Sequence, residues 1–167
     1  MARTLVVGSV LAMALAVAPR TAHADDDPPF TIGPQPVWFL LGGVTSGGTV
    51  ALADRGAFVG GELSLARVRN AKHIGIYADG YYDWGVNGTY VTGGLEAGYK
   101  LVGVDAGGAM RFAGGDNQLG VTGRLSVGLG IFNIYVRYAF FDAMTDEHVL
   151  QVGASFKLPF ATLGDGR

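Results

Sequence analysis

The chain has 167 residues, which is enough for one domain, carries a formal net charge of −2 and contains no cysteine. The absence of cysteine excludes a disulfide framework, a cysteine-based zinc site and a lipid-anchored lipoprotein. The net charge gives no indication of a basic surface for nucleic acid. Only 16% of the residues are charged, whereas 49% are hydrophobic and 28 are glycine. The protein therefore has either a large apolar core or a surface that faces lipid.

Residues 1–24 have the features of a secretory signal peptide. Arg3 supplies a positive charge, an apolar run extends from Leu5 to Ala18, and an A-x-A motif ends at Ala24. The apolar run is shorter than the roughly 20 residues that a membrane-spanning helix needs. We therefore expect cleavage after Ala24, with a retained N-terminal anchor as the alternative.

The mature chain begins with an acidic, proline-rich leader, residues 25–35, which suits neither a helix nor a central strand. Beyond it, apolar and polar residues alternate and no segment has helical spacing, which predicts an all-β chain. The alternation gives eight strands, at 36–45, 56–69, 72–84, 89–101, 103–113, 118–128, 131–141 and 147–159. Most reach the length of a tilted membrane-spanning strand, about 9 to 11 residues. The barrel domain is expected over residues 36–160, followed by a tail, 161–167.

The expected connections alternate in length. Asn70-Ala71, Val102-Gly103 and Leu129-Gly130 are read as two-residue turns, and the other connections as longer, polar loops. Short turns at one end and longer loops at the other are typical of outer-membrane barrels, in which both termini lie at the short-turn, periplasmic end. The sequence thus predicts an eight-stranded antiparallel up-and-down transmembrane β-barrel.

Alternation with period 2 gives each strand an apolar and a polar face. In segment 72–84, Ile74 and Ile76 share one face, and Tyr77 and Asp79 share the other. We expect every charged side chain on the polar face. Aromatic residues are expected on the apolar face at both ends, as in membrane girdles. They are Trp38, Tyr99, Phe132, Phe156 and Phe160 at the short-turn end, and Tyr82, Trp84, Tyr90, Phe112 and Phe140 at the other.

The charges of the polar face fall into two groups along the chain. Acids lie on the second to fourth expected strands and arginines on the fifth to seventh, so the two arcs face each other in a closed barrel. An eight-stranded lumen is just wide enough for side chains to fill it, which predicts a salt-bridged plug. Its members are Glu62, Asp79, Glu96, Arg111, Arg124 and Arg137. Lys100 and Asp105 flank the expected Val102-Gly103 turn and are expected to pair across it. The alternative is that these are solvated surface charges of a soluble barrel.

The last expected strand, QVGASFKLPF, carries Gln151, Gly153, Phe156 and Leu158 in the pattern polar-x-Gly-x-x-hydrophobic-x-hydrophobic. This resembles the C-terminal signal recognised by the barrel-assembly machinery. The mature chain up to Phe160 resembles the small eight-stranded outer-membrane proteins, such as the barrel of outer-membrane protein A and outer-membrane proteins X and W. The resemblance implies an outer-membrane location in contact with its lipids and lipopolysaccharide. The sequence ATLGDGR after the terminal aromatic departs from the pattern.

No catalytic constellation, metal site or cofactor site is recognisable. We expect a monomer with a structural or surface-interaction role. Two alternatives remain. One is a membrane-embedded hydrolase resembling the lipid A deacylase barrels, in which Ser46 would approach His148. The other is a secreted soluble lipocalin-like barrel with an apolar interior. The direction of the apolar face tests the second, and a Ser–His pair within hydrogen-bond reach tests the first.

Overall fold

A computed structural model describes residues 36–50, 55–129, 131–141 and 147–163. The expected signal peptide, the leader 25–35 and residues 164–167 of the expected tail lie outside these ranges. No helix in the described ranges is long and apolar enough to cross a membrane. The strands are β1 (Val37–Val50), β2 (Arg55–Arg69), β3 (Lys72–Asp83), β4 (Gly88–Tyr99), β5 (Val102–Ala113), β6 (Asp116–Leu129), β7 (Phe132–Phe141) and β8 (Glu147–Leu163).

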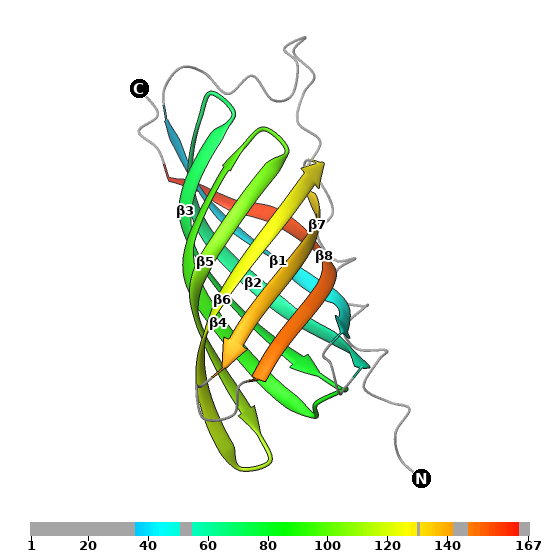
Figure 1. Cartoon of the computed structure of the whole chain (residues 1–167). Coiled ribbons are helices and arrows are strands. Elements are labelled where there is room, and N and C mark those ends of the chain that lie inside the picture. The colour runs from blue at the N-terminus through cyan, green and yellow to red at the C-terminus, as the bar shows by residue number, and fades with distance from the viewer. Residues whose placement is uncertain (1–35, 51–54, 130, 142–146, 164–167) are drawn as a thin grey trace. The chain divides into compact units, whose positions relative to one another are not determined.

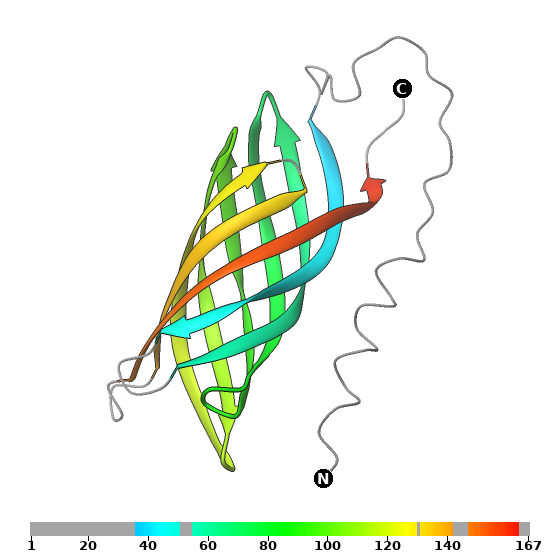
Figure 2. The same ribbon diagram turned by 90° about the vertical axis from the view of Figure 1, so that its right-hand side faces the viewer.

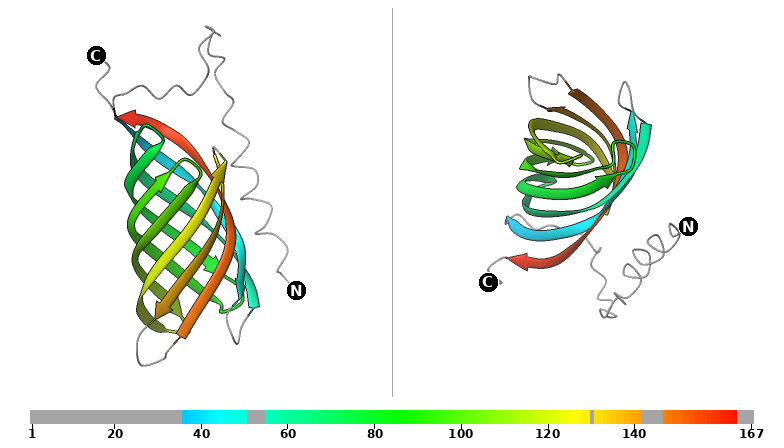
Figure 3. Two further views of the ribbon diagram at one scale, coloured as in Figure 1. Left: turned by 45° about the horizontal axis from the view of Figure 1, so that its top comes forward. Right: turned by 90° about the horizontal axis from the view of Figure 1, so that it is seen from below.

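The eight strands form one closed antiparallel barrel, which confirms the predicted fold class. Each strand pairs with its neighbours in the chain, and β8 pairs with β1 to close the ring (Figure 1). All strands tilt in the same sense around the barrel (Figure 2), and Figure 3 shows the barrel from two further directions. Closure satisfies the backbone hydrogen bonds of β1 and β8, which would otherwise be exposed edges.

β1 and β8 extend furthest beyond their predicted bounds. β1 continues to Val50, so the segment from Thr45 onward that was expected to be loop is paired with β2 and β8. β8 continues to Leu163, which lies opposite Trp38, after a register irregularity at Phe160. The barrel therefore extends three residues into the expected tail, because the first residues of β1 need backbone partners on the β8 side.

One end of the barrel holds only two-residue turns, and we call it the short-turn end. Asn70 and Ala71 form its first turn, as predicted, and both have positive φ, 47° and 62°. This is the backbone of the tight turns that suit the twist of a hairpin. Leu129 pairs with Phe132, so the third connection at this end is residues 130 and 131. It lies one residue later than predicted, and Gly130 is outside the described residues.

The second turn of this end corrects the prediction. It consists of Lys100 and Leu101, not Val102-Gly103, because Tyr99 pairs with Val102. Lys100 takes the left-handed conformation, with φ of 53°. The shift by two residues keeps Tyr99 and Val102 together on the outside of the barrel.

The opposite end, which we call the long-loop end, is less regular than predicted. Its β5–β6 connection is a two-residue turn of Gly114 and Gly115, both with positive φ. The segment AGGDNQ was expected to be a loop, but Asp116 to Gln118 belong to β6 and pair with Ala113 to Arg111 of β5. Loop length therefore sorts the two ends of this barrel less strictly than the sequence suggested.

Side chains alternate between the lumen and the outside along each strand, as the pattern predicted. In β3, Tyr77 and Asp79 are buried while Ile74 and Ile76 are 61% and 55% exposed. Two details of the prediction are wrong. Tyr90 is buried in the lumen instead of joining the outer aromatic girdle. Three charged residues point outward near the short-turn end, namely Arg67, Arg69 and Lys72.

Aromatic rings fill the lumen near the long-loop end. Tyr81 and Tyr90 stack with ring centroids 4.9 Å apart, Phe58 packs against Tyr81 at 5.3 Å, and Phe141 against Tyr90 at 5.6 Å. All four side chains are at most 2% exposed, and Val149 packs in the same cluster. Stacked and tilted rings of this kind fill space densely. This layer lies on the long-loop side of the charged residues described next.

Candidate functional site

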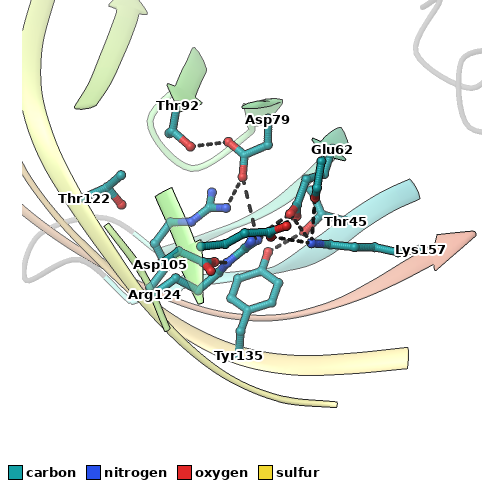
Figure 4. Close-up of polar contacts among 12 residues, drawn as sticks. Thr45, Glu62, Asp79, Thr92, Asp105, Thr122, Arg124, Tyr135 and Lys157 are labelled. Carbon is teal, nitrogen blue, oxygen red and sulfur yellow. Dashed lines mark hydrogen bonds and ion pairs between the residues drawn. The ribbon is translucent and has the colours of Figure 1, made fainter. Parts of the chain in front are cut away.

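Arg124 of β6 is the centre of an ion-pair network that crosses the lumen. Its Nη1 and Nη2 donate hydrogen bonds to the two carboxylate oxygens of Glu62 on β2, at 2.7 and 2.8 Å, and its Nε donates to Asp105 on β5. The side chains of Arg124, Glu62 and Asp105 are 4%, 0% and 5% exposed. Such two-point contacts fix the geometry of the guanidinium as well as neutralising its charge. Figure 4 shows these groups converging from strands on opposite sides of the barrel (Figure 4).

A second arginine extends the network toward the aromatic layer. Arg137 of β7 donates to Asp79 of β3, and Thr92 of β4 also donates to this carboxylate. Arg124 Nη1 lies 3.9 Å from the same Asp79 oxygen, so one carboxylate lies between two cations. The charges on these strands therefore compensate one another inside the barrel, where unpaired charges would be costly.

Lys157 of β8 extends the network toward the short-turn end. Its Nζ forms an ion pair with Glu62 and lies 3.5 Å from Glu96 Oε2 and 3.2 Å from Ser64 Oγ. Lys157 was not among the lumen charges predicted from the sequence. The sequence did contain the information needed to predict this position. Lys157 has the same parity along the strand as Gln151 and Gly153, two residues of the expected assembly signal.

Strand register explains why these groups meet. Five polar residues are paired neighbours on successive strands from β5 through β8 to β1. They are Asp105, Arg124, Arg137, Gln151 and Thr49. All five are buried, so they form one continuous polar row around the inner wall. Two arginines stand side by side in this row, and the acids of β2, β3 and β5 offset their repulsion.

The two arginines also pack between aromatic rings. Arg124 Cζ lies 5.2 Å from the ring centroids of both Tyr77 and Tyr135, and Arg137 Cζ lies 4.9 Å from that of Tyr81. Guanidinium groups are attracted to the faces of aromatic rings, most strongly where water is excluded. The ion-pair layer and the aromatic layer are thus in contact inside the lumen.

Not every residue expected in the plug belongs to the ion-pair network. Glu62, Asp79, Glu96, Arg124 and Arg137 are brought together, whereas Arg111 lies beside the aromatic layer. The Nη1 of Arg111 donates to Gln118, and its guanidinium lies over the Tyr90 ring.

The expected pair of Lys100 and Asp105 is wrong. Asp105 lies opposite Glu96, because the turn occurs two residues earlier than predicted, and it accepts its hydrogen bond from Arg124. Lys100 lies in the turn, over the ring of Tyr99. Two carboxylates therefore face each other across β4 and β5, and Lys157 and Arg124 each compensate one of them.

The assembly-signal residues occupy both faces of β8. Gln151 and Gly153 are buried on the lumen side, and Phe156 and Leu158 lie on the other parity of the strand, where Phe156 packs against Phe132 at a centroid distance of 5.0 Å. Phe160 follows at the register irregularity and is 65% exposed.

Below the ion-pair network the lumen opens into a polar cavity at the short-turn end. Its volume is about 230 Å³, and His73, Glu96, Asp105, Arg124 and Lys157 line it. The cavity thus reaches from the short-turn end to residues of the ion-pair network.

The geometry removes the specific grounds for both alternatives. Ser46 lies within β1, opposite Ala154 of β8, and His148 lies six positions further along β8. At about 3.3 Å per residue this separation is on the order of 20 Å, too far for a Ser–His pair. His148 instead hydrogen-bonds Tyr138. The lipocalin-like alternative required an apolar interior, but the described interior is polar at its centre. No described group of His, Asp and Glu is arranged to hold a metal ion.

The outside of the barrel is apolar around its whole circumference. Leu63, Ile76, Leu95, Val121 and Ile134 come from five different strands and are between 55% and 66% exposed. Water would not favour a continuous apolar belt of this kind, whereas the hydrocarbon core of a bilayer does. Aromatic residues flank the belt, including Trp38 and Tyr99 at one end and Trp84 at the other. This is the surface of a transmembrane barrel.

No protein-family model and no curated protein matches the sequence. Two solved structures have a similar fold. One is the crystal structure of Neisserial surface protein A (NspA), with a TM-score of 0.47 and 11% identity over 74% of this chain and 97% of that chain. The other is the backbone structure of the Yersinia pestis outer membrane protein Ail in a phospholipid bilayer nanodisc, with a TM-score of 0.42 and 10% identity over 72% and 99%. Both are too distant to say anything about the function of this chain.

Proposed function

We propose that the protein is an integral outer-membrane barrel with a sealed lumen, which acts through its surface and not by conducting solutes or by catalysis. The apolar belt supports membrane integration, and the features of residues 1–24 support export with cleavage after Ala24. Outer-membrane lipids, lipopolysaccharide and the barrel-assembly machinery are the partners that this role implies. All eight strands pair within one chain, which is consistent with a monomer.

The network of Arg124, Glu62, Asp79 and Arg137 is the observation that carries the sealed-lumen part of the proposal. These four side chains are between 0% and 4% exposed and bridge β2, β3, β6 and β7 across the lumen. With the aromatic layer next to them, they support a lumen through which hydrated ions do not pass. A structural or surface-interaction role fits this arrangement better than that of a general porin.

Conductance in planar lipid bilayers tests the sealed lumen. The refolded protein is expected to give no large steady conductance, because the lumen is packed. The variant Arg124→Ala should show frequent openings, because it removes the group that joins three carboxylates. Arg55, like Glu147, lies at the rim of the long-loop end, away from the network. Arg55→Ala therefore serves as a control, because it removes an arginine and leaves the network intact. Large steady conductance by the wild type would replace this proposal with a channel.

Cell fractionation tests the location independently of conductance. The protein should be recovered with the outer membrane and should migrate in gels at different positions before and after heating, because a folded barrel resists detergent until it is heated. Recovery of the protein in the soluble periplasmic fraction would contradict membrane integration.

A further inference from the structure

Of the nine described Lys and Arg residues, three point outward at one place, on the β2–β3 hairpin. Arg67 and Arg69 of β2 and Lys72 of β3 are exposed on the face that carries the apolar belt. Arg69 pairs with Lys72, and Arg67 pairs with Ile74, so the three cations are neighbours beside the Asn70–Ala71 turn. Basic side chains on the lipid side of a membrane barrel are costly at the midplane and are tolerated only near an interface.

No described acidic side chain offsets these three charges. Glu62, Asp79, Glu96 and Asp105, the acids nearest along these strands, are all buried in the lumen and engaged by Arg124, Arg137 or Lys157. No ion pair formed by Arg67, Arg69 or Lys72 occurs within the described residues. The cluster therefore presents uncompensated positive charge toward the lipid.

The cluster borders an apolar groove on the outside of the barrel. The groove has a volume of about 720 Å³ and is lined by the three cations and by residues of β3, β4 and β5. Ala97 forms its floor, because it lies in register between Ile74 and Val104, whose longer side chains are 61% and 53% exposed. Tyr99, opposite Lys72, bounds the groove toward the turn. A cationic margin beside an apolar channel is suited to a molecule with an anionic head and an acyl tail.

We propose that this groove binds an anionic phospholipid, with the phosphate at Arg67, Arg69 and Lys72 and one acyl chain along Ile74, Ala97 and Val104. The inference rests on the proposed outer-membrane location, in which the short-turn end lies at the periplasmic, phospholipid-containing leaflet. Charge complementarity selects an anionic headgroup over a zwitterionic one. Lipopolysaccharide also carries phosphate, but it belongs to the leaflet at the other end of the barrel.

The two tryptophans of the chain provide an internal probe and its control. Trp38 of β1 lies opposite Arg67, whereas Trp84 lies just beyond the other end of β3 and is 54% exposed. In the Trp84→Phe variant, Trp38 remains, and its fluorescence reports on the groove. In the Trp38→Phe variant, Trp84 remains, and its fluorescence reports on the long-loop end. Each variant is reconstituted with brominated phosphatidylglycerol or brominated phosphatidylcholine at equal mole fraction, and quenching is compared.

Trp38 should be quenched with a preference for phosphatidylglycerol of at least about fivefold, the contribution of one basic side chain near an anionic lipid surface. Trp84 should show no such preference. High salt should reduce the preference in the unaltered site, since it screens exposed charges. Adding Arg67→Gln, Arg69→Gln and Lys72→Gln to Trp84→Phe should abolish it, whereas adding Arg55→Gln, which removes an outward charge from the other end of β2, should leave it unchanged.

Equal quenching of Trp38 by the two lipids at low salt would overturn the inference, as would an equal preference at Trp84. If lipopolysaccharide competes as well as unbrominated phosphatidylglycerol at the same phosphate concentration, the assignment to a phospholipid is wrong. If neither tryptophan is quenched by either lipid, the barrel does not enter the bilayer and the proposed outer-membrane function fails. Quenching without lipid preference refutes only the binding site.

Discussion

Arg124 and Glu62 lie 62 residues apart in the chain and join β6 to β2 through two hydrogen bonds of 2.7 and 2.8 Å. These strands are four apart in the ring, so the contact spans the full width of the lumen. Backbone pairing alone leaves opposite walls of a barrel unconnected. This ion pair therefore couples two walls that would otherwise interact only through the strands between them.

Arg124→Ala should lower the free energy of unfolding by about 3 to 5 kcal/mol, the usual loss when one partner of a buried ion pair is removed, although water in the adjacent cavity will reduce the loss. Denaturant titration of the protein in lipid vesicles measures it. In double-mutant cycles, Arg124 and Glu62 should couple strongly, whereas Arg124 and Glu96 should couple weakly, because Glu96 has its ion pair with Lys157. Additive effects for Arg124 and Glu62 would show that their contact does not stabilise the barrel.

Leu95→Arg and Val136→Arg should each cost about 2 to 4 kcal/mol, because both side chains point outward near the middle of their strands. Unfolding in vesicles measures this cost as well. Leu101→Arg is the matched control. Its site is equally apolar and 51% exposed but lies in a turn, where the cost should fall to about 0 to 1 kcal/mol. Equal costs at all three positions would mean that the assigned belt does not lie at the bilayer midplane.

Gly94→Ala should destabilise the barrel by about 1 to 3 kcal/mol, the usual range for overpacking. A Cβ atom at Gly94 would lie 2.1 Å from the carbonyl oxygen of Ala106 and 2.5 Å from the Cα of Gly107, so β4 and β5 would have to move apart. Gly108→Ala is the control, because a Cβ atom there meets nothing within 4 Å. If the two alanine variants unfold at the same denaturant concentration, the close approach of β4 and β5 is not required.

Cleavage of the precursor should occur after Ala24. N-terminal sequencing of the protein from the membrane fraction should begin at Asp25, because Ala22 and Ala24 supply the small residues that the signal peptidase needs. Ala24→Arg should block processing and leave the longer precursor on gels, whereas Ala24→Ser should be processed normally. A sequence beginning at Met1 would contradict the secreted-precursor interpretation.

Much of the fold was predictable, because a period of 2 is a local property of the sequence. Eight strands and the directions of Ile74, Ile76, Tyr77 and Asp79 follow from alternation and from the fact that one face must avoid water. Strand ends were less predictable. Alternation fades where polar residues and glycines follow one another, as in the second half of β1 around Ser46, and the pairing with β2 and β8 determines the structure there.

The lumen contacts were predictable as a class but not as pairs. The sequence places acids and arginines on one face, yet partner choice depends on register, and a turn displaced by two residues moved Asp105 from Lys100 to Arg124. Arg111 has the right parity but lies too near the long-loop end to reach the network. Lys157 has the inward parity of Gln151 and Gly153, but it lies in the segment whose pattern resembles the assembly signal.

The outward cations and Tyr90 show a different limit. Parity predicts which face of a strand a residue occupies. Tyr90 shares its parity with Thr92 and Glu96, so alternation places Tyr90 in the lumen. Its assignment to the outer aromatic girdle disregarded this parity. Arg67 and Arg69 have outward parity for the same reason. In each case strand parity predicted the face correctly, whereas the usual location of that residue type in membrane proteins did not.

The pairing of β1 with β8 also determines when the protein can fold. Residue partners such as Trp38 and Leu163 come from opposite ends of the barrel sequence, so the ring cannot close until the last strand has been synthesised and exported. Until then β1 lacks its second partner, and the lumen charges lack Lys157. A polypeptide truncated before Glu147 would present open strand edges and unpaired carboxylates to the bilayer, both of which are expensive there. Premature termination should therefore yield chains that are degraded in the periplasm, not smaller barrels.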